Sequence, residues 1–280
     1  MNYIGKSYLQ LTEQEKEYFI KMYYDNLDLT VKEIGEKLGL SKRCTNLIFK
    51  EYSINSKRKN RYTLNEHYFE KIDTQEKSYI LGLIYSDGYV GNEKYNNIVI
   101  TQKEYQLLYE IKKEIEFTGE IRAGNKGGFE NSKPGYVLNF SSEKMSSDLR
   151  RLGLYPNKSL TLEKLPDLRS DLKRHFFRGY FDGDGSISNY IHTFKKNNKN
   201  YSYRKGKMSL IATEKMLYNF VKTFNIEQYH ISKSKTEQMK YMQIEAKKEL
   251  VKIYELMYKD CSICNKTKKE KWDILISAII

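Results

Sequence analysis

Residues 80–88 are ILGLIYSDG and residues 177–185 are FRGYFDGDG, so one short pattern occurs twice in the chain. Each copy is an apolar, glycine-containing run that ends in Asp-Gly, and the terminal acids are Asp87 and Asp184. An apolar run of this kind predicts a buried helix, and a glycine directly after it is a common helix stop. The repeat therefore predicts two helices, each carrying one carboxylate at its C-terminal end.

Small residues recur four positions apart in both copies, as Gly82 and Ser86 in the first and as Gly179 and Gly183 in the second. Residues four apart share one face of a helix. Two faces of small residues allow two helix backbones to approach closely. We therefore expect the two helices to pack against each other at these residues and to bring the two terminal aspartates together.

The paired aspartates predict a metal site. Two carboxylates held close together repel each other unless a cation lies between them. Oxygen ligands with open water positions suit Mg²⁺ or Mn²⁺, so Asp87 and Asp184 are predicted metal ligands. Beside a DNA strand, such ions can activate water and stabilise the leaving oxygen of an in-line displacement. An Asp-Gly pair is also an ordinary turn, but two copies in matching positions favour a shared site.

Two lysines stand at matching places near the ends of the two halves, in Asn157-Lys158-Ser159 and in Asn265-Lys266-Thr267. A lysine near the reacting phosphate would offset the charge that develops there. Lys158 and Lys266 are therefore the candidate basic residues of the catalytic site.

Each motif is followed by the same order of predicted elements: two strands, a helix, two strands and a second helix. Each half is therefore predicted to be α-β-β-α-β-β-α, over residues 66–160 and 166–280. Two candidate helix caps, Asp73 and Ser170, precede the motif aspartates by the same number of residues. The second half is longer, and its extra residues are expected in a Lys- and Asn-rich insert around residues 195–207. The predicted fold class is α+β.

The first 60 residues predict a separate all-α module, joined to the rest by a basic linker. Two capping boxes, beginning at Thr12 and Thr30, start helices, Gly39 supplies a tight turn, and Ser41 caps a third helix. Helices joined in this way resemble a helix-turn-helix DNA-binding module; a plain three-helix bundle is the alternative. The residues predicted to meet DNA at the start of the third helix are Lys42, Arg43, Thr45 and Asn46.

Charge favours a nucleic-acid partner. The formal net charge is +13 over 280 residues, and an excess of this size suits a protein that neutralises phosphates. It is concentrated in patches: residues 193–207 hold six Lys/Arg and no acid. Three cysteines argue against a disulfide scaffold, and the sequence shows neither a cleavable signal nor an apolar run long enough for a membrane span. We therefore expect a soluble protein in the cytoplasm or another reducing compartment.

The paired motifs resemble those of the LAGLIDADG homing endonucleases, in the single-chain form with two copies. The matching residues are Gly82, Leu83, Ile84, Asp87 and Gly88 in the first motif, and Gly179, Asp182, Asp184 and Gly185 in the second. Tyr85 stands in place of the first aspartate of the name pattern, so Asp182 has no acidic counterpart and its replacement by Asn is expected to matter little. The resemblance covers roughly residues 66–280.

The resemblance implies a saddle of two antiparallel sheets along the DNA major groove, with the motif helices at a pseudo-two-fold axis. It implies a monomeric, site-specific endonuclease that cuts both strands of double-stranded DNA, with Asp87 and Asp184 as metal ligands and one basic residue in each half. The alternatives are a DNA-binding transcriptional regulator and an RNA maturase that binds its host intron RNA. Candidate DNA contacts on the strands are Gln102, Arg122, Asn139, Lys195, Arg204, Lys207, Lys233 and Lys235.

Overall fold

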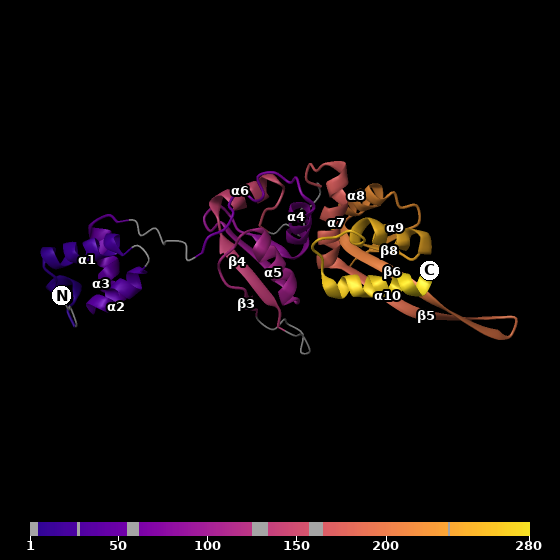
Figure 1. Ribbon diagram of the computed structural model, residues 1–280, viewed down its shortest axis with the longest axis horizontal. Helices are drawn as coiled ribbons and strands as arrows, with labels where there is room; N and C mark the ends of the chain where they lie inside the picture. The colour runs from indigo at the N-terminus through magenta and orange to yellow at the C-terminus, as the bar shows by residue number, and fades with distance from the viewer. Residues whose placement is uncertain (1–4, 27–28, 55–61, 125–133, 157–164, 235) are drawn as a thin grey trace. The chain divides into compact units, whose positions relative to one another are not determined.

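The computed structural model describes residues 5–26, 29–54, 62–124, 134–156, 165–234 and 236–280. The chain divides into two compact units, Met1–Thr63 and Leu64–Ile280, drawn in Figure 1. Within the described ranges, no helix is both long enough and apolar enough to cross a membrane.

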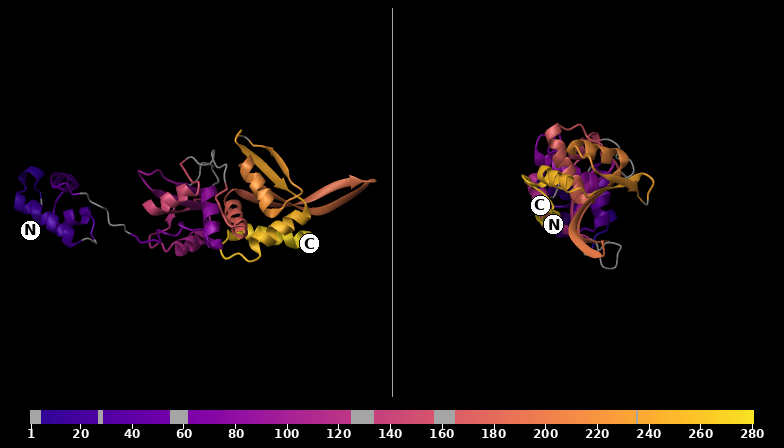
Figure 2. Two further views of the ribbon diagram at one scale, coloured as in Figure 1. Left: turned by 90° about the horizontal axis from the view of Figure 1, so that it is seen from above. Right: turned by 90° about the vertical axis from the view of Figure 1, so that its right-hand side faces the viewer.

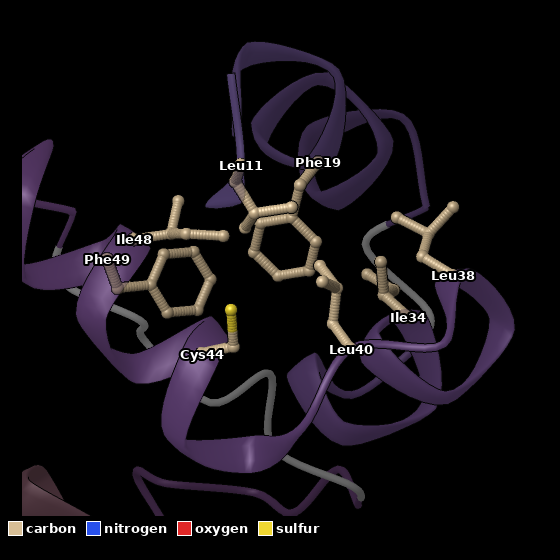
Figure 3. Close-up of a cluster of buried hydrophobic side chains, with 8 residues drawn as sticks. All are labelled: Leu11, Phe19, Ile34, Leu38, Leu40, Cys44, Ile48 and Phe49. Atoms are coloured by element: carbon tan, nitrogen blue, oxygen red, sulfur yellow. The ribbon is translucent and has the colours of Figure 1, made fainter. Parts of the chain in front are cut away.

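The smaller unit has one short 3₁₀ helix and three α-helices. Their bounds are η1 (Tyr8–Gln10), α1 (Glu13–Asp25), α2 (Val31–Leu38) and α3 (Lys42–Glu51). The predicted caps are confirmed: the side chains of Thr12, Thr30 and Ser41 each accept a bond from the backbone N–H three residues later. Gly39 makes the turn at φ +74°, which glycine adopts without a steric cost. Figure 3 shows the core of this unit, built from Leu11, Phe19, Ile34, Leu38, Leu40, Cys44, Ile48 and Phe49.

The larger unit contains the predicted order of elements twice. The first set is α4 (Gln75–Asp87), β1 (Gly88–Val90), β2 (Asn97–Gln102), α5 (Tyr105–Glu114), β3 (Arg122–Ala123), β4 (Tyr136–Ser141) and α6 (Glu143–Arg151). The second set is α7 (Ser170–Asp184), β5 (Gly185–Lys196), β6 (Lys199–Thr213), α8 (Glu214–Phe224), β7 (His230–Lys233), β8 (Met239–Ile244) and α9 (Lys247–Tyr258), followed by α10 (Lys266–Ile279). The antiparallel sheets have the orders β1-β2-β4-β3 and β5-β6-β8-β7. The α+β class with two similar halves is therefore confirmed.

Each sheet has one covered and one open face. On β2 and β4 the buried side chains alternate along the strands, and Ile98 pairs in register with Phe140. On β6, Met208 and Leu210 point the same way, toward α8 and α9. Because successive side chains of a strand point to opposite faces, the residues between them lie on the open face. Two open strand surfaces are thus available for a ligand.

The extra length of the second half lies in the lysine-rich segment, as expected from the sequence, and it takes the form of an extended hairpin. Strands β5 and β6 pair continuously from Gly185 with Leu210 to Lys196 with Lys199, and they form the long hairpin in Figures 1 and 2. Asn197 and Asn198 make the turn at φ +49° and +59°. Asparagine tolerates this left-handed conformation, and two such residues match the right-handed twist of a hairpin.

The predicted helix caps are wrong for both motif helices. In α4 the cap is Thr74, whose side chain accepts a bond from Lys77 N–H, while Asp73 forms an ion pair with Lys77 at 2.9 Å. Helix α7 begins at Ser170 itself, and Arg169 at the cap position makes no side-chain cap bond. The helices have 13 and 15 residues. Packing between them, rather than matched caps, sets where they lie.

Helix α10 (Lys266–Ile279) is present in the structure but was not among the elements predicted from the sequence. Its signals were present in the sequence: Asn265 caps it by accepting a bond from Lys268 N–H, and Trp272, Leu275 and Ile276 follow at helical spacing and are buried. This helix packs against α9, β5 and β6, and it supplies a residue of the candidate site.

Candidate functional site

The two motif helices approach each other through their glycines. A Cβ atom placed on Gly82 would lie 1.9 Å from the backbone oxygen of Phe176, and one placed on Gly179 would lie 1.9 Å from the backbone oxygen of Tyr79. Neither position has room for a side chain, so the backbones of α4 and α7 are in direct contact. Gly82 and Gly179 therefore lie where the sequence pattern placed them, at the interface of the two helices.

The C-terminal ends of the helices also meet. A Cβ atom on Gly183 would lie 1.9 Å from Ser86 Oγ and 3.1 Å from Asp87 Cγ, so the Asp87 carboxyl group is beside the residue that precedes Asp184. Both helices stop at these aspartates, and the following N–H groups, of Gly88 and Gly185, bond back into the last turns. The structure therefore brings the ends that carry the two acids together.

Gln102 holds one of the two acids. Its Nε2 donates to Asp87 Oδ2 at 2.7 Å, and its side chain lies on the covered side of β2, where the residue is buried. A DNA contact was expected from Gln102, but the alternation of the strand turns it inward. Its role in the structure is to orient the Asp87 carboxylate.

Lys268 lies near enough to both motif aspartates for their charges to act on its ammonium group. Its Nζ donates to the backbone oxygens of Phe181, Asp182 and Gly183 at 2.8, 2.6 and 3.0 Å, so its charge lies at the C-terminal end of α7. Burial lowers the pKa of the Lys268 ammonium group, and the nearby carboxylates of Asp182, Asp87 and Asp184 oppose that shift. Its signal in the sequence was the Asn265 cap, which makes position 268 part of the first turn of a helix.

The sequence-predicted lysines lie elsewhere. Lys266 Nζ is 3.6 Å from Glu110 Oε1, and its backbone N–H donates to Glu104, so its side chain pairs with α5 rather than with the motif aspartates. It is two residues from Lys268, on a different side of α10, because successive helix positions turn by about 100°. Lys158 lies outside the described residues.

Thr45 is not available to DNA, contrary to the sequence-based expectation. It is 1% exposed, its Oγ1 donates to the Lys42 backbone oxygen, and its methyl group packs against Gly35. The side chains that are exposed at the start of α3 are those of Lys42, Arg43 and Asn46.

The strand candidates divide between the two faces of their sheets. Arg122 pairs with Val137 and Lys207 with Ser188, on the open faces, and Asn139 is also on an open face. Lys195 and Arg204 are in the opposite phase from Lys207, and Arg204 lines a hollow with Asp273 and Ile274 of α10. Lys233 pairs with Lys240 on the side of the buried Met242. Lys235 lies outside the described residues.

The oxygen donors at the helix ends fit a hard divalent cation. Mg²⁺ keeps several of its waters and is usually bound by one or two carboxylates, so Asp87 and Asp184 are a sufficient protein donor set. In the part of the chain that the structure describes, no group of three or more His, Cys, Asp or Glu side chains could hold a metal ion. A site made by protein side chains alone, as in zinc proteins, is therefore not found among these residues.

Two motif helices in backbone contact, each leading into a four-stranded antiparallel sheet, make up the arrangement that the resemblance implied. The observed order of helices and strands is thus the one expected from the resemblance to single-chain LAGLIDADG endonucleases. Among solved structures, it is similar to the I-LtrWI LAGLIDADG homing endonuclease bound to target DNA, with 14% identity over 76% of this chain and 91% of that chain and a TM-score of 0.49. Meganuclease I-SmaMI bound to uncleaveable DNA has 13% identity, 71% and 89% coverage and a TM-score of 0.49.

I-SmaMI bound to uncleaved target DNA in the presence of calcium ions has 12% identity, covers 71% of this chain and 90% of that chain, and has a TM-score of 0.48. No protein-family model and no curated protein sequence matches the chain. At these identities the similarity concerns the fold alone, and the function is derived below from the residues of this chain.

Proposed function

We propose that the protein is a metal-dependent, site-specific endonuclease that acts as a monomer and cuts both strands of double-stranded DNA. The observation that carries the proposal is the meeting of the two motif helix ends. The Asp87 carboxyl group lies beside Gly183, the residue before Asp184, and the charge of Lys268 is at the same helix end. Two carboxylates near one lysine form a set that suits hydrolysis of a phosphodiester.

In this mechanism Asp87 and Asp184 would hold the divalent ions, Mg²⁺ or Mn²⁺. When bound, these ions supply a water of lowered pKa and a Lewis acid for the leaving oxygen. Gln102 fixes the plane of the Asp87 carboxylate through its 2.7 Å bond. Lys268 acts through its charge, because its three bonds to α7 carbonyls use the three donors of an ammonium group. A positive charge there favours a phosphate that becomes more negative.

The open sheet faces are the proposed DNA surface of the larger unit. Arg122, Asn139 and Lys207 lie on these faces, and the exposed Lys42, Arg43 and Asn46 of α3 add contacts from the smaller unit. Phosphate contacts of this kind set affinity and register, while base contacts set specificity.

The deciding experiment is incubation of the full-length protein with a library of random-sequence and genomic DNA duplexes, with Mg²⁺ or with EDTA, followed by sequencing of the ends produced. We expect double-strand breaks at a few related sites in Mg²⁺ and none in EDTA. Selective DNA binding without breaks would indicate a transcriptional regulator. Selective binding of structured RNA, with neither DNA breaks nor selective DNA binding, would indicate an RNA maturase.

We predict that Lys268→Met slows cleavage by about 100-fold, the effect of losing one preorganised group that stabilises developing charge. Affinity for DNA in Ca²⁺ should change little, because most affinity comes from phosphate contacts elsewhere. Single-turnover cleavage and equilibrium binding measure the two effects. Lys266→Met is the matched variant: the placement of Lys266 beside Glu110 predicts a rate near that of the unmodified protein. A slow Lys266→Met with a normal Lys268→Met would restore the sequence-based assignment.

Removal of residues 1–63 is predicted to leave metal-dependent cleavage intact and to weaken DNA binding. The boundary follows the division of the chain into its two compact units. Each lost phosphate contact reduces the slope of log affinity against log salt by about 0.9, so the slope should become shallower. Binding isotherms at several salt concentrations measure it. An unchanged slope would show that α3 does not contact DNA phosphates.

A further inference from the structure

The residue two positions before each motif aspartate differs between the halves, but it is buried in both. It is Tyr85 in α4 and Asp182 in α7, and each is 2% exposed. A shared role was not expected from the sequence, because one side chain is a phenol and the other a carboxylic acid. Their hydrogen bonds reveal the shared role.

Asp182 accepts bonds from three elements. Its donors are the Tyr79 hydroxyl of α4 at 2.7 Å, the Tyr258 hydroxyl at the end of α9, and the backbone N–H of Asn265 at 2.7 Å. A buried carboxylate is costly unless it is hydrogen-bonded, and three donors offset that cost. These three bonds are the reason to expect a larger effect of Asp182→Asn than the motif comparison alone suggested.

The bond to Asn265 determines where α10 begins. Asn265 is the cap of α10, and its Oδ1 accepts a bond from Lys268 N–H at 2.9 Å. Lys268, the lysine at the motif helix ends, therefore follows the backbone group held by Asp182 by only three positions. Lys268 also bonds to the Asp182 backbone oxygen. The side chain of Asp182 thus holds Asn265 and its backbone holds Lys268, so one residue positions both ends of segment 265–268.

Tyr85 makes the corresponding contact in the first half. Its hydroxyl donates to the backbone oxygen of Leu152, directly after α6, and it lies 2.7 Å from where a Cβ of Gly153 would be. Leu152 and Gly153 begin the segment that follows α6, just as Asn265 lies in the segment that follows α9. In both halves, then, the motif helix binds the backbone segment that follows the helix after the fourth strand, α6 in the first half and α9 in the second.

We infer that Asp182 and Tyr85 are paired positioning residues: Tyr85 fixes the segment after α6, and Asp182 fixes the segment after α9, each against its motif helix. In the second half this contact sets the position of Lys268. The inference rests on the proposed endonuclease function for its effect on cleavage, but not for its effect on structure. The two contacts use opposite chemistry: Asp182 accepts from a backbone N–H, whereas Tyr85 donates to a backbone C=O.

The test compares Asp182→Asn with Asp171→Asn, the same substitution at the exposed start of α7, where Asp171 pairs with Arg169 two residues away. The substrate is a supercoiled plasmid carrying a site that the unmodified protein cuts. Asp182→Asn should slow cleavage of one strand by about ten- to a hundredfold and accumulate nicked circles, with DNA affinity within a few-fold. Tyr85→Phe should accumulate circles nicked in the opposite strand. Asp171→Asn should behave like the unmodified protein.

Hydrogen exchange of peptides covering residues 259–270 supplies a readout that needs no DNA. Asp182→Asn should speed exchange at Asn265 and Lys268 selectively, whereas a general loss of stability would speed exchange throughout residues 64–280. Equal slowing of both strands with unchanged local exchange would overturn the inference. If the unmodified protein cuts no DNA, the proposed function fails, and the exchange result alone decides the inference. If Asp182→Asn does not fold, Tyr258→Phe removes one donor and should give the same local pattern more weakly.

Discussion

Asp87→Asn and Asp184→Asn are each expected to abolish double-strand cleavage. Asparagine keeps the size of the side chain but removes the negative charge that holds a divalent ion. The loss should exceed the roughly 100-fold cost of disturbing a partner of a metal ligand, because here a ligand itself is lost. Cleavage of a plasmid carrying the selected site, in Mg²⁺ and under single-turnover conditions, measures the effect.

Folding and DNA affinity should survive both substitutions, since each aspartate ends its helix and the phosphate contacts lie elsewhere. Asp171→Asn on α7 is the matched control, because its carboxylate pairs only locally with Arg169 and should cut normally. Full cleavage by Asp184→Asn would contradict the nuclease mechanism and leave the regulator as the better hypothesis. A protein with one aspartate replaced that still nicks one strand would show that the two acids act independently.

Gly82→Ala and Gly179→Ala are expected to destabilise the larger unit strongly. Either new methyl group would be placed 1.9 Å from a backbone oxygen of the facing helix, and backbone cannot rotate away as a side chain can. Overpacking typically costs about 1–3 kcal/mol, and we expect about 3 kcal/mol or more here. Alanine is the better helix former by about 1 kcal/mol, which offsets only part of the clash.

Urea unfolding followed by tryptophan fluorescence measures this change, because the chain has one tryptophan and Trp272 is fully buried in the larger unit. Gly124→Ala is the control. Its methyl group would meet a Val137 methyl at 3.1 Å and the Gly135 backbone oxygen at 3.2 Å, contacts that shifts of a few tenths of an ångström relieve, so its midpoint should change much less than those of the motif variants. Unchanged midpoints for both motif variants would mean that α4 and α7 do not pack as closely as the structure shows.

The repeat in the sequence predicted much of the architecture correctly. Helix-length apolar runs ending in Asp-Gly identified α4 and α7, and alternation of apolar residues identified the strands of both sheets. The capping boxes at Thr12 and Thr30 located α1 and α2 because a cap is a bond between residues three positions apart. Each of these signals depends on neighbours in the chain, so a local pattern is enough to predict it.

The long hairpin shows the limit of composition. The extra length of the second half was expected among the lysines and asparagines of residues 195–207, and the structure has it there, but the composition did not show that the segment is a continuous hairpin. The backbone pairing of β5 and β6 needs no apolar residue, and the two asparagines at the turn were the informative signal. Likewise, Arg204 and Lys207 lie on opposite faces of β6. Which of the two faces a ligand depends on which face of the sheet is covered by helices, and a local sequence pattern does not show this.

The sequence by itself determined the duplicated α-β-β-α-β-β-α order, the two helices in contact and the two motif aspartates, because periodicity, small residues and helix stops are local in the chain. Only the tertiary structure decided that Lys268, and not Lys266, lies at the helix ends. It also decided that Asp182 and Gln102 are buried residues that hold neighbouring groups in place, where the sequence had suggested a dispensable acid and a DNA contact. Those assignments depend on bonds between residues 15 to 103 positions apart. Packing of α10 and α9 against α7 creates the environment of Asp182 and Lys268, and no local pattern encodes which side chains meet there.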